Sequence, residues 1–169
     1  ELSPACNPAA YRDRHHAATL HSPLGELTLC ASDHALTAIR FPEEPPPALP
    51  VAGPNALLRE AIRQLTAYFD GRLQQFDLPL AGEGSPFQQR VWQALLQVPH
   101  GRTASYGAIA AAIGNPRACR AVGLANGRNP IAIVVPCHRI IGRNGQLTGY
   151  GGGLERKRWL LRHEGVGVN

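Results

Sequence analysis

The residues best suited to chemistry are a thiol, an imidazole and a guanidinium in a row, at Cys137, His138 and Arg139. They follow five aliphatic residues, 131–135, which indicate a buried segment, and Pro136, which cannot donate a backbone hydrogen bond. Positively charged neighbours lower the pKa of a thiol and favour the thiolate, which is the nucleophile. Free cysteines are also common as small core hydrophobes, so these residues alone leave both roles open for Cys137.

A glycine-rich loop follows this group, at Gly149-Tyr150-Gly151-Gly152-Gly153. Because few side chains intervene, the backbone of such a loop can approach a ligand closely. We expect the loop to form a pocket wall beside Cys137, and the alternative is a flexible connector.

Basic residues are concentrated in the second half of the chain. Residues 1–90 carry 7 arginines against 10 acidic residues, whereas residues 91–169 carry 9 arginines and 1 lysine against 2 glutamates. Arginine forks match phosphate oxygens, so this half is a candidate for binding nucleic acid. A solvated basic face without a partner is equally compatible with these numbers.

The overall composition bounds the class of protein. A chain of 169 residues with 44% hydrophobic residues can bury a core that is stable without disulfide bonds or structural metals. Its 4 cysteines are irregularly spaced, and no apolar stretch near the N-terminus resembles a signal or membrane segment. We therefore expect a soluble intracellular protein, and the absence of methionine indicates a processed or truncated start.

An antiparallel sheet and a helix are predicted for the first half. Residues 26–30 and 36–41 alternate as half-buried strands do, whereas residues 1–20, without periodicity, are expected to be a polar lead-in. The spacing over residues 55–71 predicts an amphipathic helix, and residues 75–80 are expected to supply a further strand. The inward face of that helix is expected to hold Leu58, Ile62, Leu65 and Phe69.

Helices dominate the prediction for the second half. Ser85 can cap a helix, with Gln88 completing a capping box. The apolar face of this helix is expected to hold Phe87, Val91, Trp92, Leu95 and Leu96. Two short helices, from Ser105 to Gly114 and over residues 117–126, are separated by a tight turn and predict a helix-turn-helix.

The last part of the chain is predicted to contain a hairpin and a helix. The Asn144-Gly145 pair favours a hairpin turn between residues 140–141 and 146–148, and residues 154–164 predict a closing helix.

The expected fold class is α/β, in two domains of residues 1–81 and 82–169. The N-terminal domain has a small antiparallel sheet plus a helix. The C-terminal domain is mostly helical, with a winged-helix-like helix-turn-helix. The boundary rests on the glycine patch at residues 82–84, where the charge balance also reverses.

Four motifs in the second half stand out together: the helix of Tyr106, Arg120-Ala121-Val122-Gly123, Pro136-Cys137-His138-Arg139 and His163-Glu164-Gly165. In this order they resemble the O6-alkylguanine-DNA alkyltransferases, also called methylated-DNA-protein-cysteine methyltransferases. The resemblance runs from about residue 85 to residue 165, with a weaker match at residues 22–25. It implies a DNA repair protein that flips a damaged nucleotide and transfers the alkyl group from guanine O6 irreversibly to its own cysteine, once per molecule.

The resemblance also assigns catalytic roles. Cys137 would attack the alkyl carbon, His138 would take the thiol proton through a water, and Glu164 would orient that imidazole. Tyr106 would donate to N3 of the departing guanine, although a packing aromatic is its alternative. This is the logic of a nucleophile, a base and an orienting acid.

Further positions follow from the same resemblance. The substrate pocket would involve Asn129, Val135, Pro136, Ile140, Tyr150 and Gly151, with Asn129 as a hinge or, alternatively, an ordinary loop cap. Many relatives have serine where Gly151 stands, so a side-chain contact is in doubt there. The DNA-binding residues would be Ser105, Arg117, Arg120, Ala121, Gly123 and Arg128, with Arg120 filling the gap left by the flipped nucleotide in the minor groove.

No cofactor and no metal are expected. Some relatives hold zinc, but the spacing of Cys6, His15, His16, Cys30 and His34 does not follow the pattern of the family. The expected partner is double-stranded DNA containing O6-alkylguanine, with no membrane association. A monomer, cooperative or not on DNA, is expected in the cytoplasm, associated with the nucleoid if the source is bacterial.

Two other functions compete with alkyl transfer. A DNA-binding regulator or damage-recognition protein would bind the flipped base without reacting, but it has no need of an activated thiol. A cysteine hydrolase would use Cys137, His138 and Glu164, but it leaves the basic helix-turn-helix unexplained.

Overall fold

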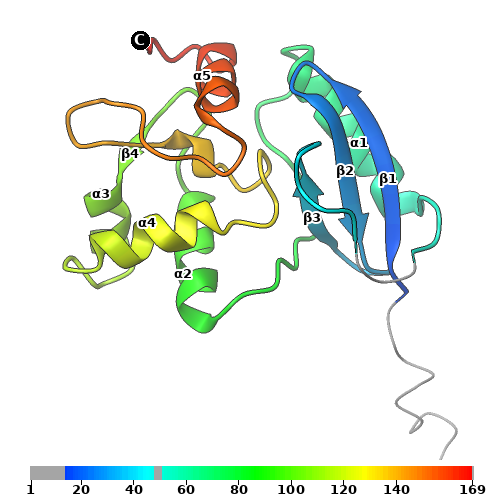
Figure 1. The fold of residues 1–169 in the computed structure, drawn as a ribbon, viewed down its shortest axis with the longest axis horizontal. Helices are drawn as coiled ribbons and strands as arrows, with labels where there is room; N and C mark the ends of the chain where they lie inside the picture. The colour runs from blue at the N-terminus through cyan, green and yellow to red at the C-terminus, as the bar shows by residue number, and fades with distance from the viewer. Residues whose placement is uncertain (1–13, 48–50, 169) are drawn as a thin grey trace, which may run out of the picture.

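The computed structural model describes residues 14–47 and 51–168. In Figure 1 the sheet lies on the right, and the helices within residues 86–127 lie on the left. Three antiparallel strands form the sheet in the order β1-β2-β3. They are β1 (His16–Ser22), β2 (Gly25–Ala31) and β3 (Leu36–Arg40). Helix α1 (Ala56–Phe69) packs on this sheet, as its apolar spacing predicts.

Strand β1 corrects the prediction that residues 1–20 form a lead-in without regular structure. It pairs with β2 over its whole length, from His16 opposite Ala31 to Ser22 opposite Gly25. Only Ala18 of β1 is buried, so the edge strand lacks the alternation that reveals a half-buried strand. Residues 1–13 of the predicted lead-in lie outside the described residues.

The caps of α1 are confirmed, and its predicted face packs against the core, with Leu58 and Leu65 buried and Phe69 partly buried. Asn55 Oδ1 accepts from the Leu58 amide, and Gly71 follows the helix with φ +78°. Tyr68 is fully buried, whereas Phe69 is only partly so. The predicted strand over residues 75–80 is wrong, because a single bridge joins Leu80 to β3.

Helix α2 (Pro86–Leu95) begins with the predicted capping box between Ser85 and Gln88. Its face is buried at Val91, Trp92 and Leu95, but Leu96 is 38% exposed, which corrects that assignment. The helix has already ended there, and the C-cap residue turns outward.

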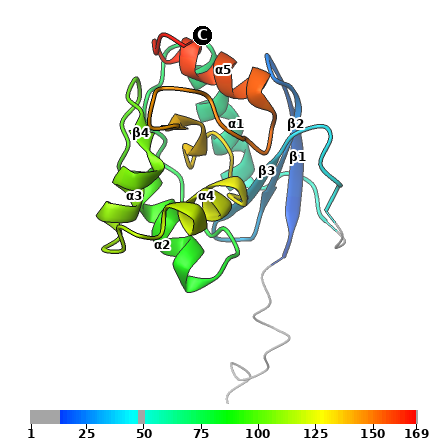
Figure 2. The ribbon, with the colours of Figure 1, turned by 60° about the vertical axis from the view of Figure 1, so that its left-hand side comes forward.

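The helix-turn-helix is confirmed as α3 (Tyr106–Ala112) and α4 (Cys119–Gly127), which pack against each other and against α2 (Figure 2). Ser105 Oγ caps α3 by accepting from the Ala108 amide. Helix α4 begins two residues later than predicted, since Asn115 to Ala118 form a turn closed by a backbone hydrogen bond.

The segment that leads to Cys137 is buried as predicted and consists of tight turns. Val134 N–H donates to Ala132 O and Val135 N–H to Ile131 O. Ile133 has φ 75°, a left-handed conformation that a β-branched residue rarely adopts. These turns end at the short 3-10 helix η3 (Cys137–Arg139).

The predicted hairpin after η3 is wrong. Strand β5 (Ile140–Ile141) pairs in parallel with β4 (Ala104–Ser105) rather than with residues 146–148. A turn at Asn144-Gly145 does form, closed by Gly142 N–H donating to Gln146 O. The closing helix is α5 (Leu154–His163), as predicted within one residue, and Leu160 and Leu161 lie in the core.

Several contacts join the sheet to the second half. Arg156 of α5 forms a two-pronged ion pair with Glu43, and its Nε donates to Leu24 O. Ile39 N–H of β3 donates to Pro130 O at 2.9 Å. These contacts hold the segments around Cys137 against the sheet. None of the described helices is long and apolar enough to cross a membrane.

Candidate active site

Cys137 opens η3 on the wall of a cavity of about 570 Å³. The residue is 4% exposed, and its N–H donates to Val135 O at 2.8 Å. Both halves of the molecule line the cavity, since Arg40 and Phe41 line it together with Cys137 and the glycine-rich loop. A small molecule or a single base therefore has room beside the sulfur.

Cys137 is a neutral thiol at neutral pH. Burial raises its pKa to about 11, although the Asn129 side chain, the charge of Lys157 and the Tyr150 hydroxyl oppose that rise. A nucleophilic role therefore requires a base that removes the proton.

His138, the next residue in the chain, is the candidate for that base. Its side chain is fully buried, and Nε2 lies 2.8 Å from Glu164 Oε2. Burial lowers the pKa of His138, while the hydrogen bond to Glu164 acts against that shift. Nδ1 is buried and has no hydrogen-bond partner among the described residues. An ionised Glu164 accepts a hydrogen bond from the N–H at Nε2 of His138. Nδ1 is therefore the nitrogen that can take a proton.

Glu164 is the centre of a buried polar cluster. Arg139 donates to both carboxylate oxygens, from Nε at 2.8 Å and from Nη2 at 3.0 Å, and also to Val98 O. Tyr68 donates to Oε2 at 2.6 Å. Burial would raise the pKa of Glu164, but the hydrogen bonds from His138 and Arg139 outweigh it and hold the pKa well below its usual range.

Lys157 is a second buried cation near the thiol. It has no exposed surface, and Nζ donates to Thr148 O at 3.0 Å. Burial lowers the pKa of Lys157 to about 8, against the attraction of Cys137. The Thr148 hydroxyl in turn shares a hydrogen bond of 2.6 Å with the Tyr106 hydroxyl. Lys157 therefore interacts with the nucleophile by charge and is linked through Thr148 to the predicted proton donor.

The predicted pocket residues fall into two groups. Asn129, Tyr150 and Gly151 line the cavity with Cys137. Val135, Pro136 and Ile140 do not line it, although all three are buried close by in the chain. Asn129 joins the groups, because its Nδ2 donates to Val135 O at 2.8 Å.

The predicted DNA-binding residues lie mainly on α4 and in the segments just before and after it. Arg117, Arg120, Ala121 and Arg128 are exposed, and Arg128 also lines the cavity. Gly123 instead lies under the Tyr106 ring, where an added Cβ would be 3.7 Å from the ring carbons. Ser105 is half-buried because its hydroxyl caps α3.

Two residues of the polar cluster, Tyr68 and Lys157, were not predicted from the sequence, and Arg139 was predicted only as a charged neighbour of the thiol. Lys157 is three and four residues before Leu160 and Leu161, so helical spacing already places it on the inward face of α5. Tyr68 follows Leu65 by three residues in the same way. Tyr68 lies 96 residues from its partner Glu164, so no local pattern identifies that contact.

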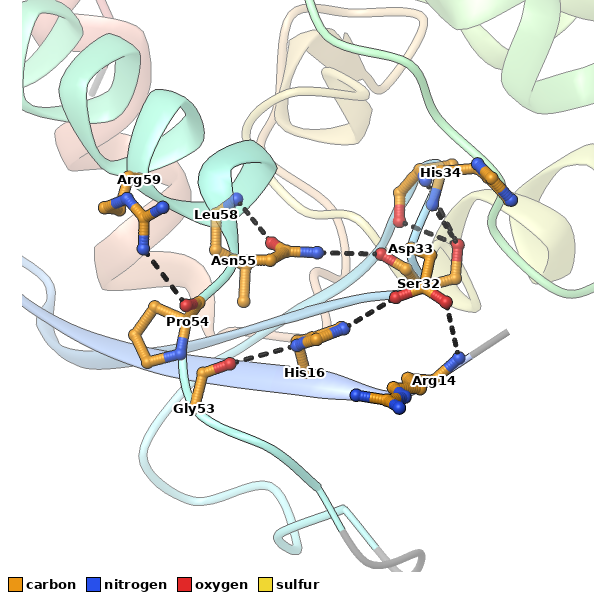
Figure 3. Close-up of polar contacts among 11 residues, drawn as sticks. Arg14, His16, Ser32, Asp33, His34, Gly53, Pro54, Asn55, Leu58 and Arg59 are labelled. Atoms are coloured by element: carbon orange, nitrogen blue, oxygen red, sulfur yellow. Dashed lines mark hydrogen bonds and ion pairs between the residues drawn. The ribbon is translucent and has the colours of Figure 1, made fainter. Parts of the chain in front are cut away.

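Of the residues considered for zinc, His16 forms hydrogen bonds with other groups of the first half of the chain. Cys6 lies outside the described residues. Figure 3 shows His16 between Gly53 O and Asp33 Oδ1, at 3.0 and 2.9 Å, and the hydrogen bond with Asp33 raises the pKa of His16. Within residues 14–47 and 51–168, no group of three or more histidine, cysteine or acidic side chains could hold a metal ion.

Comparisons with known proteins cover both halves of the chain. Residues 86–166 match the family model for the DNA binding domain of 6-O-methylguanine DNA methyltransferase, and residues 16–81 match the model for its ribonuclease-like domain. A methylated-DNA–protein-cysteine methyltransferase of Mycobacterium tuberculosis is 55% identical over 152 residues, which are 88% of this chain and 92% of that protein. Its namesake in Methanosarcina acetivorans is 50% identical over 153 residues, covering 88% and 97%.

A solved structure agrees with the sequence relatives. The crystal structure of Mycobacterium tuberculosis OGT in complex with DNA matches with a TM-score of 0.83 at 53% identity. The match covers 88% of this chain and 92% of that one. The similarity therefore extends over the sheet, the helix-turn-helix and the segment that contains Cys137.

Proposed function

The chain belongs to the methylated-DNA–protein-cysteine methyltransferase family, and from this premise we propose that it repairs O6-alkylguanine in DNA by taking the alkyl group onto Cys137. The observation that carries the proposal is the buried thiol on the cavity wall, with His138 and Glu164 behind it. Thiolate suits the reaction, because a saturated carbon needs a soft and strong nucleophile.

The proposed step begins with the proton of Cys137. His138 takes it at Nδ1 through a water, and Glu164 stabilises the resulting imidazolium. The bond from Sγ to the alkyl carbon then forms while the bond from that carbon to O6 breaks. The electron pair of the broken bond stays on guanine, and Tyr106 donates a proton or a hydrogen bond to N3. No step removes the alkyl group from Cys137, so each molecule reacts once.

The exposed face of α4, together with the residues that flank the helix, is the proposed DNA interface. Arg117, Arg120 and Arg128 can neutralise phosphates there, and Ala121 adds little bulk. The target atom is inaccessible inside a duplex, so the nucleotide must leave the stack. We propose that α4 enters the minor groove and that Arg120 occupies the vacated space, which lets the base reach the cavity beside Arg128.

The remaining parts of the proposal concern organisation. A domain boundary between residues 81 and 82 is supported by two hydrogen bonds that point opposite ways. Ala81 N–H donates to Leu36 O of the sheet, and Gln89 of α2 donates to Gly82 O. We propose that the protein is a monomer, whether or not its binding to DNA is cooperative. We also propose that it is located in the cytoplasm, where it associates with the nucleoid if the cell is bacterial.

The test is a count of methyl groups. Protein is incubated with excess duplex DNA carrying O6-methylguanine that is labelled in the methyl group. The amount of label on the protein and the amount of repaired guanine are followed until both reach a plateau. The proposal predicts one methyl group per protein and one repaired guanine per protein. Continued repair would favour a hydrolase, and tight binding without label would favour a damage-recognition protein.

A further inference from the structure

Tyr68 reaches the active site from the first half of the chain. It lies on α1, 96 residues before Glu164, and its hydroxyl donates to Glu164 Oε2 at 2.6 Å. The side chain is fully buried. Its ring packs against Phe76, with ring centroids 5.4 Å apart, and against His163 at 5.1 Å. The ring is therefore held between the segment that follows α1 and helix α5.

Tyr68 and His138 form hydrogen bonds with the same oxygen atom of Glu164. Oε2 accepts from Tyr68 and lies 2.8 Å from His138 Nε2, whereas Arg139 alone donates to Oε1. The Glu164 side chain is fully buried, so its orientation depends on these donors alone. Without Tyr68, Oε2 has two donors left, and both come from η3.

We infer that Tyr68 is a positioning residue for the transfer, whose hydroxyl holds the Glu164 carboxylate in the orientation that fixes His138 behind Cys137. The inference rests on the proposed function and adds to it a role for the first half of the chain. α1 then supplies a donor that completes the catalytic arrangement of the second half.

Two effects on His138 follow. The imidazole keeps Nε2 on Glu164 and Nδ1 directed to the proton of Cys137, which is the geometry that a general base needs. Tyr68 also shares the negative charge of Oε2, which limits how strongly Glu164 attracts a proton on His138. The charged and titratable groups that face His138 and Glu164 are Tyr68, His100, Cys137, Arg139, Lys157 and His163.

Tyr68→Phe tests the inference, because it removes the hydroxyl and keeps the ring. Single-turnover rates with free O6-benzylguanine are measured against pH, so that DNA binding does not enter. We expect a rate about tenfold lower at neutral pH, as for loss of a hydrogen bond to a charged group. We also expect the acidic limb of the profile to move to higher pH, since the unshared charge of Glu164 raises the pKa of His138.

Phe76→Leu is the matched control, because it loosens the same aromatic packing and leaves the hydroxyl in place. It should keep the pH midpoint of wild-type protein. An unchanged profile in Tyr68→Phe, or an equal shift in both variants, would overturn the positioning role. Wild-type protein that takes no methyl group from duplex DNA containing O6-methylguanine would instead overturn the proposed function.

A second substitution covers the case in which Tyr68→Phe does not fold. A fluorinated tyrosine with a more acidic hydroxyl, placed at position 68 alone, strengthens donation to Glu164 and preserves the packing. The acidic limb should then move to lower pH, opposite to Tyr68→Phe. A limb that stays in place would contradict the inference.

Discussion

Two regions adjoin Cys137, and they differ in how far their charges are already paired. Behind the thiol, Arg139 and Glu164 are buried and bonded to each other. In front of it, Arg120 and Arg128 are exposed on and just after α4. The buried region is complete without a ligand, whereas the exposed region presents charges that a polyanion can neutralise.

The difference separates chemistry from recognition. The buried cluster fixes the state of Glu164 and the free nitrogen of His138 before any substrate arrives. Among the described residues, Arg120 and Arg128 donate no hydrogen bond to that cluster, and they can engage DNA of any sequence through phosphates. Substitutions behind the thiol should therefore affect folding and transfer, whereas substitutions in front should affect only the use of duplex DNA.

Breaking the buried pair should have the largest effect. Arg139→Met leaves the Glu164 charge without its cation, which typically costs about 3–5 kcal/mol of unfolding free energy. Arg63→Met is the control, because Arg63 pairs with Glu60 on the surface of α1 and such pairs contribute about 1 kcal/mol or less. Urea unfolding measures both, and equal losses would contradict the contrast between buried and exposed charges.

Arg120→Ala should separate recognition from chemistry. If Arg120 replaces the flipped nucleotide, its loss should slow repair of O6-methylguanine in duplex DNA about a hundredfold, because unstacking costs a few kcal/mol. The rate with free O6-benzylguanine should stay as in wild type. Arg59→Ala, an exposed arginine on α1, should change neither rate. A similar loss with both substrates would remove the flipping role.

Lys157→Met should have a smaller effect that depends on pH. The ammonium opposes the rise in the Cys137 pKa, so its loss should slow transfer to free O6-benzylguanine about tenfold at neutral pH. Because the pKa of Lys157 is about 8, wild-type protein itself loses this charge above that pH. The ratio of the two rates should therefore shrink as pH rises past 8, and a constant ratio would limit Lys157 to packing.

Local signals in the sequence predicted most of the fold. Ser85 and Gln88 form their capping box, and Asn55 caps α1, because these contacts involve residues only three apart. Strand β1 was missed because an edge strand with one buried residue has no clear periodicity. The division after residue 81 stays a prediction.

The candidate site was predictable where its residues are adjacent or belong to a motif. Cys137 and His138 are neighbours, and Glu164 was added only by resemblance to a family. Tyr68 could not be assigned, since its contact with Glu164 depends on how α1 packs against the second half. The roles assigned to Arg120 and Tyr106 stay predictions.

The most direct measurement is peptide mass spectrometry after incubation with excess duplex DNA containing O6-methylguanine. The chain has an internal control, because Cys119 is exposed and Cys137 is buried. Unspecific methylation would reach the exposed thiol first, whereas transfer from a flipped base in the cavity reaches only Cys137. The account predicts one methyl group, on the peptide that contains Cys137. Methyl groups on Cys119, or unmodified Cys137 in protein that binds the lesion, would contradict it.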